Sequence, residues 1–429
     1  MRPLCWLTPI VLASCGVMLA ATVLAHASSP LRLGWMIPQE VSQSGALVSK
    51  APEMAVDGSG NVHLVWVEGT LYQEDMYYVK SSDQGNTWSD PETIDTALGS
   101  HDVSVAVDIT GTVHACWWDG NPPHPPDLPY ELLYAQRTSS GWAMGEPGVV
   151  VTNSWMTGPA IRAAGDDLHV VWSNRLEPAP DIYYSRRPID GDEWLTPTVI
   201  MDTGPASQYA EMAVDKNGNL HLVWHENTKP DNEIMYVSGT VGIGETTWSS
   251  PVTVSADVTL NATSPNILVG PDDTVHIVFG MLVPGVLGQA DTHDVYYASF
   301  LISNTEDISP TVIPNSRSRI SEMLPADASP SIVVDGADNV HVLWNGKRGS
   351  DLWDRIYHAV SDDQGESWSQ PMAISPDDAW PDGFPTAATG GTLVHVAWQQ
   401  IGLEPDSDIY YTHSLPTSTL LPLALKDYS

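Results

Sequence analysis

One short pattern of apolar and polar positions recurs seven times along the chain. An apolar run ends near an Asp, a polar turn follows, and an alternating run then places a His among valines and leucines before a closing Trp or Phe, as in APEMAVDGSGNVHLVW at 51–66. Alternation at every second residue is typical of β-strands, and a regular period of about 50 residues predicts an array of one supersecondary unit. The shared histidines are His63, His114, His169, His221, His276, His341 and His395.

Each unit is predicted to contain four strands. The first two are the apolar run and the His-containing run, joined by a turn rich in Asp, Gly and Asn. A Tyr-rich run such as MYYVK at 76–80 gives the third, and a Trp followed by Pro, as in TWSDPETI at 87–94, marks the fourth. Pro fits an outermost strand, which can lack one N–H donor. The fold class we predict is all-β, a seven-bladed β-propeller of four-stranded antiparallel blades.

The two chain ends are predicted to complete one blade together. After IYYTHS at 409–414 no Trp-x-x-Pro follows, whereas GWMIPQEV at 34–41 supplies that element before the first unit. We therefore expect the N-terminal segment to form the outer strand of the last blade beside Tyr410, which would remove an open sheet edge. The propeller is assigned to residues 28–415. The tail 416–429 is a weaker candidate for that strand, or an export or attachment tail.

The N-terminus is predicted to be a signal peptide, residues 1–27. Arg2 precedes an apolar run, and Ala25-His26-Ala27 has the small-x-small form of a cleavage site, so we expect a secreted or cell-surface protein that begins near Ser28. Two alternatives stay open. Leu12-Ala13-Ser14-Cys15 resembles a lipoprotein box that would lipidate Cys15, and the run is long enough for an uncleaved anchor. No other segment is long enough to be transmembrane.

The charge and cysteine content limit the classes of partner and the cross-links that we expect. The formal net charge of −36 argues against nucleic acid and against an anionic membrane, because phosphate binding needs clustered Lys and Arg. Outside the leader only Cys116 remains, so no internal disulfide is expected. We expect a monomer without cofactor. Calcium is the alternative, since the turns at 57–61 and 215–219 are slightly similar to calcium loops but lack the ligand count.

Two units carry a further motif between their third and fourth strands, Ser-x-Asp-x-Gly-x-Thr/Ser-Trp. Its residues are Ser81, Asp83, Gly85, Thr87 and Trp88, and Ser361, Asp363, Gly365, Ser367 and Trp368. This motif resembles the Asp-box, or bacterial neuraminidase (BNR) repeat, and the chain resembles the sialidase-like superfamily of propellers over nearly all of residues 31–415. The resemblance implies that Asp caps a turn, Gly supplies a positive φ and Trp packs between sheets, on the face opposite the ligand site.

The resemblance does not extend to a sialidase active site. A sialidase needs three arginines, a Tyr–Glu pair and an Asp; no Arg-Ile-Pro motif occurs, and Arg162 is the only arginine in a predicted first strand. Tyr209 and Glu211 lie two apart in one strand and would point to the same side, or else form an ordinary polar strand end. The catalytic candidates, if the protein is an enzyme, are Tyr209, Glu211, Glu226, Arg175, Arg348 and Arg355.

Two carboxylate pairs and the repeated histidines are candidates for glycosidase or metal chemistry. Glu53 with Glu68, and Glu211 with Glu226, occupy equivalent places in two units. The separation of such carboxyl groups distinguishes retaining from inverting glycosidases, but repetition favours an architectural role. The histidines occur once per unit, so they cannot converge on one metal ion, and a structural role is expected.

Four tryptophans outside the repeat positions point to a ligand face. They fall in connections that emerge on one face of a propeller, where exposed rings stack on sugars or on apolar peptide side chains; folding down as plugs is the alternative. We predict a sialidase-like propeller that binds a glycan or an extracellular protein without catalysis. The alternatives are an exo-sialidase-like glycoside hydrolase with an atypical site on the loop face, and a protein scaffold. The predicted ligand-binding residues are Trp118, Asp119, Trp155, Trp353, Trp380, Glu53 and Glu68.

Overall fold

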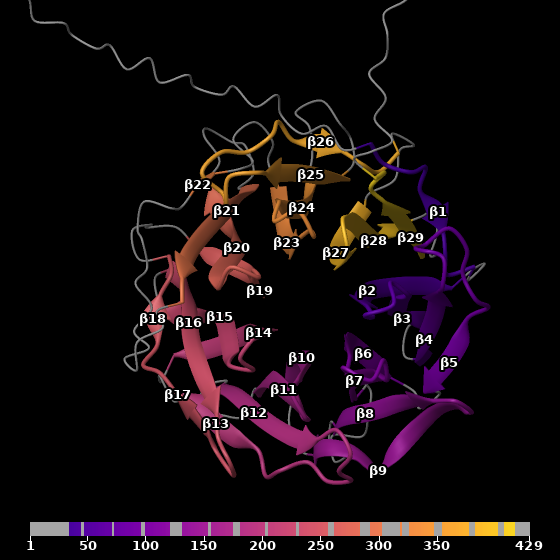
Figure 1. The fold of residues 1–429 in the computed structure, drawn as a ribbon, viewed down its shortest axis with the longest axis vertical. Helices are drawn as coiled ribbons and strands as arrows, with labels where there is room; N and C mark the ends of the chain where they lie inside the picture. The colour runs from indigo at the N-terminus through magenta and orange to yellow at the C-terminus, as the bar shows by residue number, and fades with distance from the viewer. Residues whose placement is uncertain are drawn as a thin grey trace, which may run out of the picture.

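The structure is a computed structural model that describes most of residues 34–416. Its regular elements are β-strands arranged as a ring around a central axis (Figure 1). In the part of the chain described, no helix has the length and apolarity needed to cross a membrane. The internal segments outside the description are 44–46, 71–72, 96–98, 121–130, 153–155, 175–180, 202–204, 229–230, 256–260, 284–291, 303–317, 320–325, 347–353, 377–381 and 402–406.

The described strands form five hydrogen-bonded sheets, so the prediction of seven separate four-stranded blades is wrong. Two sheets have four strands, one has five and two have eight. The larger sheets arise where the first strand of one repeat pairs with the third strand of the preceding repeat, at Val48↔Ser407 and at His293↔Ala326. These pairs satisfy backbone groups at strand ends and join two repeats into one blade. By hydrogen bonding the propeller has five blades.

The strands are distributed among the five sheets as follows. One eight-stranded sheet contains β1 (Gln39–Glu40), β2 (Val48–Val56), β3 (Val62–Thr70), β4 (Gln73–Ser81), β5 (Glu92–Asp95), β27 (Asp382–Gly390), β28 (Leu393–Ile401) and β29 (Ser407–His413). The other contains β19 (Ala262–Val269), β20 (Thr274–Val283), β21 (Thr292–Leu301), β22 (Ser318–Arg319), β23 (Ala326–Val334), β24 (Val340–Gly346), β25 (Arg355–Ser361) and β26 (Met372–Ala373). The five-stranded sheet contains β14 (Ala206–Val214), β15 (Leu220–Thr228), β16 (Asp231–Val241), β17 (Thr246–Trp248) and β18 (Val252–Thr253). The four-stranded sheets contain β6 (Ser100–Val107), β7 (Val113–Asp119), β8 (Glu131–Thr138) and β9 (Gly141–Thr152), and β10 (Met156–Ala164), β11 (Asp167–Asn174), β12 (Asp181–Pro188) and β13 (Thr198–Met201).

The N-terminal strand closes the ring, as predicted. Strand β1 pairs antiparallel with β29, with Glu40 opposite Tyr410 and Gln39 opposite Tyr411. Trp35 forms a further antiparallel bridge with Ser414. The pairing gives β29 a partner on its outer side, which leaves no open edge there.

Seven edge-to-face aromatic contacts link each repeat to its neighbour around the ring. Their ring centroids lie 4.8 to 5.4 Å apart, a separation at which such a pair adds about 0.5–1.5 kcal/mol beyond its buried area. The repeated Trp near the fourth strand thus packs between repeats. The pairs are Trp35–His358, Trp88–Tyr411, Trp142–Tyr78, Trp194–Tyr134, Trp248–Tyr184, Phe300–Tyr236 and Trp368–Tyr297.

The repeated histidines are buried and hydrogen-bonded within their own sheets. His63 Nδ1 lies 2.8 Å from the Tyr78 hydroxyl, and its Nε2 lies 3.4 Å from Asp57 Oδ2. Burial lowers the pKa of His63 to about 4, so the ring is neutral at neutral pH. In five other repeats the histidine Nδ1 likewise lies 2.6 to 2.8 Å from a tyrosine hydroxyl, and His341 Nδ1 lies 3.0 Å from His358 Nε2. This agrees with the structural role predicted for the histidines.

The two Ser-x-Asp loops are closed by their own side chains. Asp83 Oδ1 accepts hydrogen bonds from the Thr87 backbone N–H and the Ser81 hydroxyl, both at 2.8 Å. The Ser81 hydroxyl oxygen accepts from the N–H of Gly85, whose φ is +87°. The loop at Ser361–Trp368 repeats these bonds.

Candidate functional site

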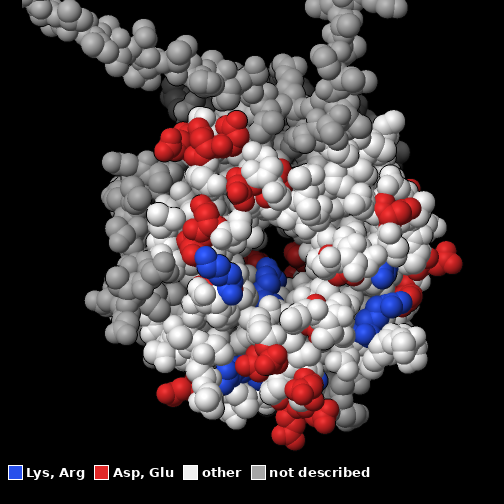
Figure 2. Space-filling model, viewed as in Figure 1, with Lys and Arg blue, Asp and Glu red and all other residues white. Residues whose placement is uncertain are grey.

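A central cavity of about 770 Å³ runs along the innermost strands of the ring. Its walls are β2, β6, β10, β14, β19, β23 and β27, which surround the axis in Figure 1. The space-filling view along the same direction shows the hollow, with both acidic and basic side chains close to it (Figure 2). We call the end of the cavity at which the inner strands begin its mouth.

Every inner strand carries a β-bulge near this mouth. The register to the next strand shifts at the same place in all seven inner strands. Six of the bulges hold a residue with φ between +39° and +53°, a region that non-glycine residues rarely adopt. A bulge leaves the ladder and re-aims its residue, so these residues turn toward the mouth. They are Ala51, Asp102, Gly158, Tyr209, Ser264 and Phe384.

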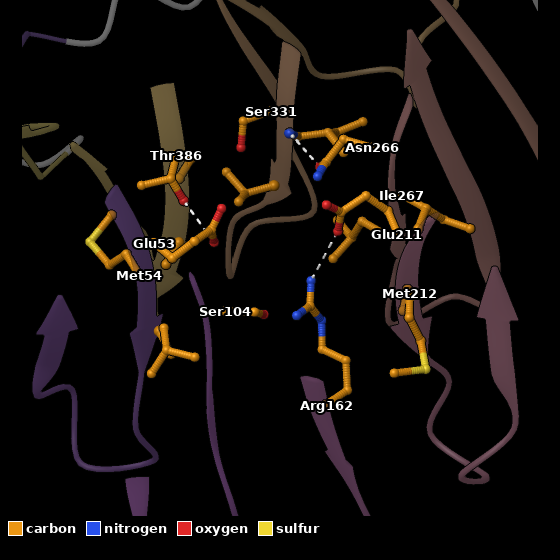
Figure 3. A pocket seen from close by; sticks show the side chains of 18 of the residues that line it. Glu53, Met54, Ser104, Arg162, Glu211, Met212, Asn266, Ile267, Ser331 and Thr386 are labelled. Atoms are coloured by element: carbon orange, nitrogen blue, oxygen red, sulfur yellow. Dashed lines mark hydrogen bonds and ion pairs between the residues drawn. The ribbon is translucent and has the colours of Figure 1, made fainter. Parts of the chain in front are cut away.

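The residue two positions after each bulge residue forms a ring inside the cavity. In the close-up, its six polar members line the cavity (Figure 3). Part of this ring joins neighbouring repeats: Ser104 Oγ accepts from the Ile161 backbone N–H at 3.2 Å, and Asn266 Oδ1 accepts from that of Ile332 at 3.2 Å. The members are Glu53, Ser104, Glu211, Asn266, Ser331 and Thr386, whereas Ala160 at the same position of β10 is buried in the core.

Glu53 and Glu211 face each other across the cavity, with Arg162 reaching between them (Figure 3). Arg162 Nη2 lies 3.6 Å from Glu211 Oε2, whereas Glu53 accepts from the Thr386 hydroxyl at 3.4 Å. Burial raises the pKa of Glu53 to about 8, and the Glu211 carboxylate adds to the rise while Arg162 opposes it. Burial also raises the pKa of Glu211, against the lowering effect of Arg162. Glu53 therefore holds a proton at neutral pH.

Two exposed aromatic rings lie at the mouth. The side chain of Tyr209 is 45% exposed and that of Phe384 is 58% exposed, and both residues occupy bulges. Tyr209 packs against the buried His225, with ring centroids 5.2 Å apart. Burial lowers the pKa of His225 to about 4, so its ring is uncharged at neutral pH. An apolar face is thus offered beside a polar cavity.

Trp118, a predicted ligand residue, is held at the same end. It lies within β7 rather than in a loop, its indole N–H donates to Asp102 Oδ2 at 3.0 Å, and its ring stacks on His101 with centroids 4.5 Å apart. Asp102 also accepts from the Gly158 backbone N–H at 3.3 Å. Asp119 ends the same strand, opposite Ser100.

The predicted carboxylate pairs are not formed. Glu68 accepts from the Trp66 indole N–H and the Ser49 hydroxyl, at 2.9 and 3.0 Å. Glu226 makes the equivalent bonds in its own repeat, both at 2.7 Å. These two carboxylates anchor strands, while Glu53 and Glu211 turn into the cavity and oppose each other instead.

The Tyr209–Glu211 pair also differs from the prediction. The bulge between Gln208 and Glu211 breaks the alternation of the strand, so Tyr209 contacts His225 whereas Glu211 enters the cavity. Arg355 lies in β25 rather than in a loop, and its guanidinium donates to the Ser375 carbonyl. Five further predicted residues lie outside the described ones: Arg175, Arg348, Trp155, Trp353 and Trp380.

The turn at 57–61 uses its carboxylate locally. Asp57 Oδ1 accepts from the backbone N–H groups of Ser59 and Asn61, both at 2.9 Å, and Oδ2 accepts from the Asn61 amide at 2.6 Å. These bonds lower the pKa of Asp57 against the effect of burial. This is turn chemistry of the kind that Asp favours.

Sequence reasoning missed Phe384, Asp102 and the facing of Glu53 and Glu211. A signal for them exists in the sequence: four bulge residues precede a Pro, and the cavity residue follows that Pro, as in Ala51-Pro52-Glu53. Pro lacks an N–H and so tolerates a place where the ladder is interrupted.

Comparisons with known proteins identify the fold. No protein-family model matches the chain, and neither does any curated protein sequence. Solved structures do match, as all-β propellers. A protein of unknown function from Dyadobacter fermentans DSM 18053 has a TM-score of 0.55 and 13% identity, covering 90% of this chain and 99% of its own.

The names of two further solved structures describe enzymes that act on glycans. A PL25 ulvan lyase bound to -[GlcA(1-4)Rha3S]- has a TM-score of 0.58 and 12% identity, covering 88% of this chain and 97% of its own. The phage phi92 endosialidase has a TM-score of 0.54 and 10% identity, covering 92% and 71%. The chain is thus a propeller whose structural neighbours include glycan-processing enzymes; identities this low show the fold alone.

Proposed function

We propose that this protein is a secreted glycan-binding propeller without catalytic activity, and that its ligand occupies the mouth of the central cavity. The observation that carries the proposal is the pair of exposed rings, Tyr209 and Phe384, at the rim of a cavity whose wall carries hydroxyl, amide and carboxyl groups. Aromatic faces stack on the apolar faces of sugar rings, and a few placed polar groups bind sugar hydroxyls.

Other predicted residues extend the same face in this proposal. Trp118 is fixed by Asp102, which itself lines the cavity, so its ring adds a third aromatic surface near the mouth. We also assign the two Ser-x-Asp loops as Asp-boxes. The strand that leads into each begins at the mouth end, since Gln73 pairs with Thr70 there, so the loops lie at the opposite end. A structural role for these loops is consistent with the ligand face lying at the mouth.

A sialidase-type reaction has less support. Among the described residues lining the cavity, Arg162 is the only arginine or lysine, whereas a sialidase clamps its substrate carboxylate with three arginines. The bulge between Gln208 and Glu211 also breaks the alternation that would place Tyr209 and Glu211 on one side of the strand. The glycan-binding proposal needs neither group to react.

Removing either rim aromatic should weaken glycan binding. We expect Tyr209→Ala and Phe384→Ala each to raise Kd for a glycan found on an array by about tenfold, since a lost stacking contact is worth about 1.4 kcal/mol. Ile109→Ala is the matched control, because Ile109 is 85% exposed in the turn between β6 and β7, at the far end of the inner strand. Calorimetric titration gives Kd, and thermal unfolding checks that each variant is folded.

Two results would contradict the proposal. An unchanged Kd in both aromatic variants would remove the mouth as the binding face. Turnover of a fluorogenic sialoside by the wild type, lost in Glu211→Gln and in Tyr209→Phe, would establish the hydrolase instead.

A further inference from the structure

We infer that the cavity accepts an uncharged sugar unit and discriminates against sugars that carry a carboxylate or a sulfate. This inference rests on the proposed glycan binding and adds the chemical class of the ligand. An uncharged sugar differs from the ligand named for the ulvan lyase structure, which contains a uronic acid and a sulfated rhamnose.

The cavity offers little free positive charge to a ligand. Arg162 is the only basic side chain among the described lining residues, and it is already engaged. Its Nη2 lies 3.6 Å from the Glu211 carboxylate, and its Nη1 donates to the Ile161 carbonyl at 2.8 Å. Recognition of an anionic sugar favours a guanidinium that is open to two parallel hydrogen bonds. Arg162 therefore balances the protein's own charge, and only part of its guanidinium is left for a ligand.

Glu53 and Glu211 face each other across the space that a ligand would enter (Figure 3). With Glu53 protonated, the Glu211 carboxylate offsets the Arg162 guanidinium, so no net positive charge remains for an acidic ligand. The Glu211 carboxylate already raises the pKa of Glu53 by repulsion. A ligand carboxylate or sulfate would add a further negative charge at short range in a partly desolvated space, where repulsion is stronger than in water.

The polar residues that line the cavity offer uncharged hydrogen-bonding groups. Ser104, Ser331 and Thr386 supply hydroxyl groups, which can both donate and accept, and a protonated Glu53 can do the same. A sugar ring without charge presents matching donors and acceptors at each hydroxyl. With Tyr209 and Phe384 at the rim, a sugar would meet apolar rings at the mouth and uncharged hydrogen-bonding groups inside the cavity.

The test is a glycan array of matched pairs, in which each neutral oligosaccharide stands beside its sialylated, uronic-acid or sulfated counterpart, for example lactose beside 3′-sialyllactose. We expect the neutral member of the bound pairs to have a Kd at least about tenfold lower. The ratio should increase between pH 7 and pH 9, because Glu53 then loses its proton.

Two isosteric variants locate the discrimination. Glu211→Gln frees the Arg162 guanidinium, so we expect the acidic counterparts to gain about tenfold in affinity relative to the neutral ones. Glu53→Gln should abolish the pH dependence of the ratio, because an amide at this position does not titrate. The wild-type ratio and its pH dependence test the inference even where a variant fails to fold.

The outcomes separate the two proposals. Tighter binding of the acidic members, or a ratio that does not change in Glu211→Gln, overturns the selection of neutral sugars while glycan binding stands. Absence of binding to every glycan overturns the proposed function and this inference with it.

Discussion

Gly85→Ala should reduce the free energy of unfolding by about 4 kcal/mol, whereas Gly111→Ala should cost only about 1 kcal/mol. The two glycines have nearly the same backbone conformation, with φ values of +87° and +84°. They differ in their surroundings. A Cβ at Gly111 would meet nothing within 4 Å, but one at Gly85 would overlap the ring and hydroxyl of Tyr411.

The overlap cannot be relieved cheaply. Tyr411 is fully buried, its hydroxyl lies 2.6 Å from His395 Nδ1, and its ring packs edge-to-face on Trp88. The shared φ penalty cancels in the comparison, so the difference between the variants measures the docking of this loop onto the neighbouring repeat. Urea unfolding at neutral pH gives both values. Equal losses would mean that the loop does not dock on Tyr411, and Gly365→Ala should behave like Gly85→Ala because its added Cβ would overlap Tyr297.

The features that the sequence predicts correctly are those that the repeat period and local chemistry specify. The structural role of the repeated histidines, the packing of Trp88 against a neighbour and the pairing of β1 with β29 each depend on residues at a fixed place in the unit. The number of blades does not depend on residues at a fixed place in the unit. A single bridge such as Val48↔Ser407 joins two repeats into one sheet, and no residue type marks such a bridge.

The sequence does not predict which side chains meet in the cavity, because the bulges break the two-residue period of the strands. Strict alternation would place Tyr209 and Glu211 on one side of their strand, but the bulge between Gln208 and Glu211 sends them to different surroundings. The approach of Glu53 to Glu211 depends on ring closure, since the two residues lie 158 positions apart and on different sheets. No pattern within one repeat could reveal it.

Lowering the pH from 7 to 5 should destabilise this protein steeply. Burial lowers the pKa of His63, His169, His276 and His395 to about 4 each, well below the value of about 6.5 for an unfolded chain. Between these values the unfolded chain binds more protons than the folded one, so stability rises with pH. The stability that these groups contribute is complete above pH 6.5 and is lost as the pH falls toward 4.

The size of the effect follows from the number of groups. Each such histidine removes at most about 2 kcal/mol of stability between pH 6.5 and pH 5. Glu53 acts in the opposite direction, because its pKa is raised, so its contribution falls as pH rises through 8. Five described carboxyls have raised pKa values and eight described histidines have lowered ones, so the histidines outnumber the carboxyls and the net slope stays positive.

A single-site variant isolates one imidazole in this behaviour. His395→Gln should be less stable than the wild type at pH 7, because it loses the bond to Tyr411, yet it should lose about 2 kcal/mol less between pH 7 and pH 5. His101→Gln is the control at a partly exposed histidine near the mouth, where a smaller change is expected. Urea midpoints measured across this range give the slopes. Parallel slopes for the wild type and His395→Gln would show that the buried imidazole takes up its proton without unfolding. The buried, uncharged histidines would then have no part in the loss of stability in acid.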